Sequence, residues 1–357
     1  MATQTRQLCD LLTAEGVSVE IVRTNAAYRP RFVERLRIVR ALFRIVPYLG
    51  QLWKAAGRST VVHVMANSGW AWHLFAAPAI WIGKLRGTRV IVNYRGGAAE
   101  SFLGRSIAIV RPTLRMADGV VVPSEFLREV FAGFGIDATV VPNIVDVTRF
   151  APAPISAPDR IASAPHVVIA RNLEPIYDIA TAIEAFAILH EARPAARFSI
   201  AGSGPERAML EGLVEKLGLT KAVTFCGTLS RDAMADLYHQ ATLMVNSSRV
   251  DNTPNSLLEA MACGIPIVST NVGGIPYLVQ DRTTAMLVPP GRPDALAQAM
   301  AEVLDDSTLR DVLVGNGLRV AQRCAWDKIF PMWIRVYRPN PAGAGDRDEV
   351  QGAGPRR

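Results

Sequence analysis

The sequence predicts an α/β protein of two domains, each a parallel sheet with helices on both faces. Three observations predict this class. Short apolar runs alternate with helical segments of roughly ten residues in both halves of the chain, which is the pattern of β-α-β units. Residues 151–165, rich in alanine and proline, separate the halves and lack any helical or alternating period. Half of the 357 residues are hydrophobic and a fifth are charged, which excludes a disordered or fibrous chain.

The first domain, residues 1–150, begins with a helix predicted at about 3–14. Strands are predicted at 17–22, 61–65, 90–94, 120–122 and 140–141. A doubly wound domain normally begins with its central strand, whose loss leaves backbone groups unpaired on both neighbours. We therefore expect that strand upstream of the chain, or lost by truncation. A rearranged sheet is the alternative.

The second domain, residues 166–325, repeats the alternation. Strands are predicted at 167–170, 198–201, 223–225, 243–246, 267–269 and 286–288. Helices are predicted at 179–190, from the turn at 202–205 to about 217, at 231–240 and at 254–263. The two Rossmann-like domains leave a cleft between them, and ligands of such sheets bind beyond the carboxyl ends of the strands. Residues 326–338 are predicted to form a helix, and the Pro- and Gly-rich tail 339–357 is predicted to be disordered.

The segment 246–264, NSSRVDNTPNSLLEAMACG, carries the strongest local signal. Thr253 is a favourable N-cap, and Pro254 suits the first position of a helix. The amides of Asn255, Ser256 and Leu257 then lack intrahelical partners, and such a helix start binds phosphate groups well. The segment therefore predicts a diphosphate site at the start of this helix.

Two acidic residues in this segment, Asp251 and Glu259, are separated by seven others, and AMACGIP follows them. This pattern resembles the signature of the family 4 retaining glycosyltransferases of the GT-B fold, whose first acid is usually Glu. The resemblance implies that Asp251 hydrogen-bonds the donor sugar and that Glu259 holds the ribose. It also implies that the helix at 326–338 crosses back to the first domain.

Further blocks resemble the family in order and spacing. Arg171, after the first strand of the second domain, corresponds to an arginine that contacts the donor phosphates, and the lysine often found five residues later is missing from Ile176-Tyr177-Asp178. The remaining donor-side positions lie in three loops after strands: Gly202 and Gly204; Phe225, Cys226 and Gly227, where backbone groups are expected to bind the nucleobase; and Gly273 and Gly274 near the sugar. We expect these loops and Asp251 to converge on one crevice.

Two strand ends of the first domain are expected to face the cleft on the acceptor side. They contain Asn67 and Gly69 in one loop, and Asn93, Gly96 and Gly97 in the other. The family often has a His-Gly pair at the second site, with the histidine touching the donor sugar, whereas this chain has Arg95-Gly96. Arg95 is predicted to pair with the diphosphate or with an acidic group. A structural or acceptor-side role is the alternative.

Positive charge is concentrated in the first half of the chain. Residues 1–165 contain 20 basic and 11 acidic residues, whereas the rest contain 19 basic and 21 acidic residues. Residues 29–58 combine eight basic residues, one acid and an apolar stripe, which is typical of a helix on an anionic membrane surface or of a helix packed on its own sheet. No nucleic-acid recognition motif is visible. The four separated cysteines, Cys9, Cys226, Cys263 and Cys324, favour a reducing compartment.

These features favour a retaining glycosyltransferase that moves a sugar from a UDP- or GDP-linked donor to a lipid-linked, polysaccharide or small-molecule hydroxyl. The resemblance implies no metal and no cofactor beyond the nucleotide sugar. It also suggests polysaccharide or glycolipid assembly in the cytoplasm, with peripheral contact at the inner face of the membrane. A non-catalytic binding or scaffold protein and a UDP-sugar epimerase remain as alternatives.

Overall fold

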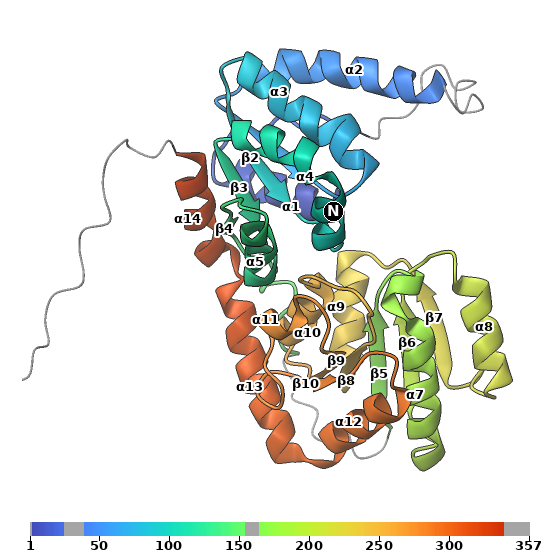
Figure 1. Ribbon diagram of the computed structural model, residues 1–357. Helices are drawn as coiled ribbons and strands as arrows, with labels where there is room; N and C mark the ends of the chain where they lie inside the picture. The colour runs from blue at the N-terminus through green and yellow to red at the C-terminus, as the bar shows by residue number, and fades with distance from the viewer. Residues whose placement is uncertain (1, 25–38, 154–163, 339–357) are drawn as a thin grey trace, which may run out of the picture.

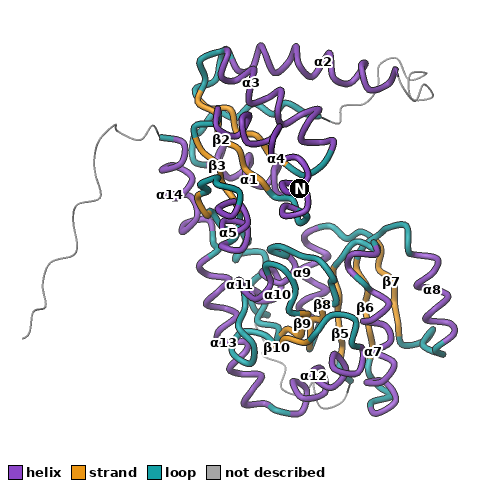
Figure 2. Tube along the Cα trace, in the orientation of Figure 1, coloured by secondary structure: helices purple, strands orange, loops and turns teal. Residues whose placement is uncertain are grey.

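The computed structural model describes residues 2–24, 39–153 and 164–338 of the chain. It confirms the predicted fold class: two α/β domains, each built on a parallel sheet (Figure 1, Figure 2). Most of the predicted linker, and all of the predicted tail 339–357, lie outside the described residues.

The sheet of the first domain has four parallel strands in the order β1-β2-β3-β4. Its strands are β1 (Val61–Ala66), β2 (Arg89–Tyr94), β3 (Gly119–Val122) and β4 (Thr139–Val140), and its helices are α1 (Ala2–Ala14), α2 (Val39–Ala56), α3 (Ala77–Leu85), α4 (Ala99–Met116) and α5 (Glu125–Gly133). The apolar strands are covered on both faces, because helices α2 to α5 pack on one side and α1 on the other.

The strand predicted at 17–22 is absent. These residues form no strand, and β1 pairs with β2 alone among the described strands. A β-strand needs a neighbour for its backbone groups, and this segment has none beside it. Val17 and Val19 instead pack against the apolar cluster that contains Leu8 of α1 and Ile91 of β2. The strand expected upstream of the chain stays a prediction.

The second domain has six parallel strands in the order β10-β9-β8-β5-β6-β7. The strands are β5 (His166–Ala170), β6 (Arg197–Ala201), β7 (Val223–Gly227), β8 (Leu243–Asn246), β9 (Ile267–Thr270) and β10 (Met286–Val288). Strand order reverses between β5 and β8. Ligands of doubly wound sheets bind at the carboxyl ends of the strands on either side of such a reversal.

The helices of the second domain cover both faces of its sheet (Figure 1). They are α7 (Ile179–Ala192), α8 (Arg207–Lys216), α9 (Arg231–Gln240), α10 (Asn255–Ala262), α11 (Ile275–Leu278), α12 (Pro293–Asp305) and α13 (Ser307–Arg323). Gly264 ends α10 as the sequence suggests: its φ is +72°, and the amides of Gly264 and Ile265 donate to the carbonyls of Met261 and Ala260.

The last helix, α14 (Trp326–Tyr337), crosses back to the first domain as predicted (Figure 1). Ile329 and Trp333 are buried with Leu8, Ile91 and Val121 of the first domain. The apolar face of α14 therefore ties the end of the second domain to the face of the first sheet that α1 also covers.

Candidate functional site

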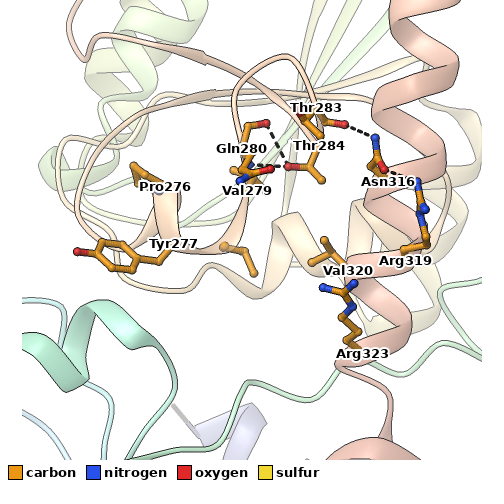
Figure 3. A pocket seen from close by; sticks show the side chains of 11 residues that line it. Pro276, Tyr277, Val279, Gln280, Thr283, Thr284, Asn316, Arg319, Val320 and Arg323 are labelled. Atoms are coloured by element: carbon orange, nitrogen blue, oxygen red, sulfur yellow. Dashed lines mark hydrogen bonds between the residues drawn. The ribbon is translucent and has the colours of Figure 1, made fainter. Parts of the chain in front are cut away.

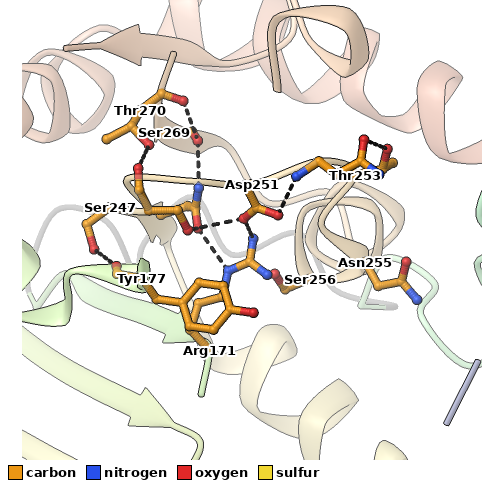
Figure 4. Close-up of polar contacts among 12 residues, drawn as sticks. Arg171, Tyr177, Ser247, Asp251, Thr253, Asn255, Ser256, Ser269 and Thr270 are labelled. Carbon is orange, nitrogen blue, oxygen red and sulfur yellow. Dashed lines mark hydrogen bonds and ion pairs between the residues drawn. The ribbon is translucent and has the colours of Figure 1, made fainter. Parts of the chain in front are cut away.

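Arg171 and Asp251 form a buried ion pair at the point where the order of the second sheet reverses. Arg171 follows β5, and Asp251 lies in the loop after β8. The Arg171 Nη2 donates to Asp251 Oδ2, and its Nε donates to Asn246 Oδ1 at 2.9 Å (Figure 4). The side chains are only 10% and 11% exposed. The Asp251 carboxylate also accepts from the Ser248 hydroxyl and the Asn252 amide, so its position is fixed within the protein itself.

Glycines bring the neighbouring loops onto this pair. At Gly202, where φ is +146°, a Cβ would overlap the carbonyl oxygen of Arg171; at Gly273, where φ is +52°, it would overlap that of Asp251. The Gly202 amide donates to the Gly227 carbonyl at 2.8 Å, and the Gly274 amide to the Asp251 carbonyl at 3.1 Å. The four loops therefore converge as the sequence predicts.

The start of α10 differs in detail from the prediction. Thr253 is not the N-cap: the helix begins at Asn255, and Pro254 occupies the N-cap position with a ψ of 120° and no side-chain cap. The Thr253 carbonyl instead accepts from Asn143 of the first domain, and the Leu257 amide is bonded to the Pro254 carbonyl. The amides of Asn255 and Ser256 remain without a backbone partner among the described residues, as does the buried Ser256 hydroxyl.

Glu259 lies one turn further along α10, in a half-buried position. Burial raises the pKa of Glu259 to about 7, although Arg231 and Arg171 act in the opposite direction. Sequence analysis missed Arg231, which pairs with Asp146 at 3.4 Å and lies over the ring of Phe150. The Glu259 carboxyl group thus lies in the field of two cations and is near its midpoint of ionisation at neutral pH.

Across the cleft, amide oxygens hold the side chain of Arg95. Arg95 donates to Asn93 Oδ1 at 3.2 Å, to Gln4 Oε1 at 3.1 Å and to Asn143 Oδ1. Burial lowers the pKa of Arg95 to about 10. Asn143 in turn donates to the Thr253 carbonyl at 2.9 Å and to Asn255 Oδ1 at 2.7 Å. Asn143, which lies three residues after the end of β4, therefore links Arg95 to the start of α10.

Asn93 does not face an acceptor. It is fully buried and lies 3.0 Å from His63 Nε2. Alternate residues of a strand point to opposite faces, so Asn93 shares the face of Ile91 and Arg95 that α1 and α14 cover. The structure therefore places Asn93 in the interior, bonded to Arg95 and His63, and not on an exposed surface as an acceptor-side position requires.

The other predicted positions line the rim of the cleft or support its loops. Gly96 is buried, and a Cβ there would lie 2.6 Å from Asn67 Oδ1, so it is a packing position; Gly97 is exposed. Gly69 has a φ of +71°. The backbone of Gly204 packs on that of Leu173. Cys226 is half-buried, and Arg207 lies over the Phe225 ring at 4.7 Å.

Two further contacts join the domains, and no local sequence pattern predicts either of them. The Ser124 hydroxyl donates to Asn252 Oδ1 at 2.7 Å, and the Tyr277 hydroxyl donates to Glu129 Oε2 at 2.6 Å. Since Asn252 lies between Asp251 and α10, these contacts place the end of β3 directly over the loop that holds the ion pair.

We also searched the described residues for a metal site, a membrane-spanning helix and a separate cavity. Within the described residues, no group of three or more His, Cys, Asp or Glu side chains is placed to hold a metal ion, and no helix is long and apolar enough to span a membrane. A cavity of about 400 Å³ lies between α11 and α13, lined by residues that include Gln280, Asn316 and Arg323 (Figure 3). It contains none of the predicted site residues.

Both halves of the chain match known protein families. Residues 1–143 match the glycosyl transferase 4-like domain, and residues 159–320 match the glycosyl transferases group 1 family. An uncharacterized glycosyltransferase of Methanocaldococcus jannaschii is 34% identical over 144 residues, which cover 40% of this chain and 37% of that protein. A D-inositol 3-phosphate glycosyltransferase of Thermobispora bispora is 25% identical over 344 residues. The match covers 93% of this chain and 75% of that protein. The chain spans 35% to 58% of the length of the first curated relatives it matches.

Among solved structures, Anabaena HepE in complex with UDP and glucose has a TM-score of 0.71 at 20% identity, covering 92% of this chain and 88% of HepE. This likeness shows the fold. The chain therefore resembles a glycosyl transferase 4-like domain in its first half and the glycosyl transferases group 1 family in its second, and its fold is that of HepE.

Proposed function

We propose that the protein is a retaining glycosyltransferase that moves a sugar from a UDP- or GDP-linked donor to the hydroxyl of a glycan or glycolipid acceptor. One observation carries the proposal: Arg171, Asp251 and the start of α10 meet where the strand order of the second sheet reverses, which is where doubly wound sheets bind nucleotides. HepE, of similar fold, has been solved with UDP and with UDP-glucose, and that supports a nucleotide-sugar donor.

The donor is proposed to lie along the second domain. Its diphosphate occupies the start of α10, where the Asn255 and Ser256 amides and the helix dipole favour an anion. Glu259 accepts from the ribose hydroxyls, and Asp251 from hydroxyls of the sugar. The loop at Phe225–Gly227 contacts the base, and Gly273 and Gly274 border the sugar.

Leaving-group stabilisation is proposed as the main catalytic contribution of the protein. Negative charge grows on the diphosphate as the sugar–phosphate bond breaks, and preorganised donors and cations lower the barrier. Arg171 and the helix amides supply that field without a metal ion. The acceptor hydroxyl attacks the same face of the sugar that the diphosphate leaves, and contact between the domains aligns the two substrates and excludes water.

A membrane-facing role is proposed for helices α2 and α3. Four large apolar side chains on them are exposed: Val46 (64%), Trp53 (45%), Trp81 (46%) and Leu85 (72%). The two helices lie on the side of the first domain away from the second (Figure 1), and the first half of the chain carries the positive surplus. An anionic bilayer is a suitable partner for such a surface.

Release of UDP or GDP from a panel of nucleotide sugars tests the proposed reaction. With an acceptor mixture and EDTA present, the wild-type protein is expected to turn over at least one donor. Asp251→Ala and Glu259→Ala are expected to lose most of that turnover, whereas Glu215→Ala, which removes an exposed acid of α8, keeps it.

Unchanged turnover in Asp251→Ala and Glu259→Ala would place the reaction elsewhere. Nucleotide binding without turnover favours the binding or scaffold alternative, and interconversion of the free donor sugar favours the epimerase.

A further inference from the structure

Arg95 is a half-buried cation that pairs with no acid in the described part of the chain. Its three hydrogen-bond acceptors, Gln4, Asn93 and Asn143, are uncharged amides, and it forms no ion pair with any acid in the described part of the chain. The titratable group that influences it is Tyr337, whose pKa burial raises, so that hydroxyl stays neutral. Withdrawing a charge from water, even partly, is costly unless the charge is paired, which points to an anion in the working complex.

The other cation of the site is already neutralised. Arg171 is paired with Asp251, and its Nε is bonded to Asn246. The second domain also lacks a basic residue at Ile176–Asp178. A diphosphate at the start of α10 therefore meets helix amides and one compensated arginine from its own domain, which leaves most of its charge unmatched.

The link between Arg95 and that position is short and passes from one domain to the other. One side chain, Asn143, accepts from Arg95 and donates to the Thr253 carbonyl and to Asn255 Oδ1. Asn143 is buried, so it fixes the guanidinium relative to the first turn of α10. Arg95 Nη2 makes no hydrogen bond among the described residues and is available to an oxyanion.

We propose that Arg95 is the second diphosphate-binding cation of this enzyme, supplied from the first domain, with Asn143 as its positioning residue. This inference rests on the proposed function. When the bond from the sugar C1 to the diphosphate oxygen breaks, its electron pair stays on that oxygen, beside Arg95. The acceptor oxygen bonds to C1, and its proton passes to the leaving diphosphate. The contact between the domains is then part of the leaving-group site.

Calorimetric titration of the intact chain tests this. UDP and GDP first identify the base, and the nucleoside, monophosphate and diphosphate of that base are then compared in wild-type protein, Arg95→Gln and Arg95→Lys. Arg95→Gln is expected to weaken diphosphate binding about tenfold or more, with little effect on the nucleoside or monophosphate. Arg95→Lys is expected to restore part of the loss. Arg89→Gln removes a cation at the other end of β2 and is the matched control.

The other outcomes are distinct. If neither UDP nor GDP binds the wild-type protein, the proposed function fails together with this inference. Equal diphosphate affinity in Arg95→Gln overturns the inference and leaves the proposed function intact. A uniform loss for all three ligands means a structural role and overturns it as well. A loss confined to UDP-glucuronate, when compared with UDP-glucose, would assign Arg95 to a sugar carboxylate and overturn the diphosphate assignment.

Discussion

Individual charged side chains in the cleft have distinct electrostatic roles. Arg171 and Asp251 compensate each other, Arg95 is held by amides alone, and Glu259 is a half-buried carboxyl group influenced by two arginines. Removing one partner of a buried ion pair leaves an uncompensated charge, which typically costs about 3–5 kcal/mol of stability. Asp251 therefore has a structural role besides its proposed contact with the sugar, and loss of activity in Asp251→Ala must be compared with the folding of the variant.

Glu259 is expected to make stability depend on pH. Burial raises its pKa from 4.5 to about 7, so its ionised form is penalised in the folded state. Its contribution to stability is complete below about pH 4.5 and is lost as the pH rises through about 7. Glu259→Gln stays neutral, so its stability relative to wild type is expected to rise by up to about 3 kcal/mol over that range.

Urea denaturation between about pH 5 and about pH 8 measures this difference. His63, whose pKa burial lowers to about 3, is present in both proteins and cancels. Glu215→Gln on the surface of α8 is the control and is expected to follow wild type at every pH. Parallel curves for wild type and Glu259→Gln would show that Glu259 is not buried as described.

At the level of single elements, the strands were predictable and the exact start of α10 was not. Continuous apolar runs between helical segments locate the buried parallel strands within one or two residues. The start of α10 depends on a partner far away in the sequence: Asn143 binds the Thr253 carbonyl, so Thr253 lies outside the helix. The segment 17–22 has a strand-like composition, but composition does not supply the neighbour that a strand needs.

The α2–α3 surface is expected to bind anionic vesicles. Trp81→Ser combined with Leu85→Ser removes two exposed apolar side chains of α3 and is expected to abolish most sedimentation with vesicles that contain phosphatidylglycerol, because less apolar area enters the interface. Met209→Ser with Leu217→Ser, two exposed positions of the second domain, is the control and keeps binding. Equal sedimentation of both double variants would contradict the proposed surface.

For the molecule as a whole, the sequence predicted two domains and the crossover helix, but it did not predict how the domains touch. The acids of the α10 region, Arg171 and the glycine loops lie on one domain, so their order and spacing in the sequence could predict them as a site. Three contacts between the domains join residues more than a hundred positions apart: Ser124 with Asn252, Asn143 with Thr253, and Glu129 with Tyr277. A single sequence shows no periodicity for such pairs, so they were found only in the structure.

The central claim is that a nucleoside diphosphate binds at the start of α10, between the two domains. A crystal structure with UDP or GDP tests it most directly. We expect a phosphate oxygen within hydrogen-bonding distance of the Asn255 or Ser256 amide, with the ribose beside Glu259. A nucleotide bound elsewhere, with its phosphates away from α10 and its ribose away from Glu259, would contradict the account.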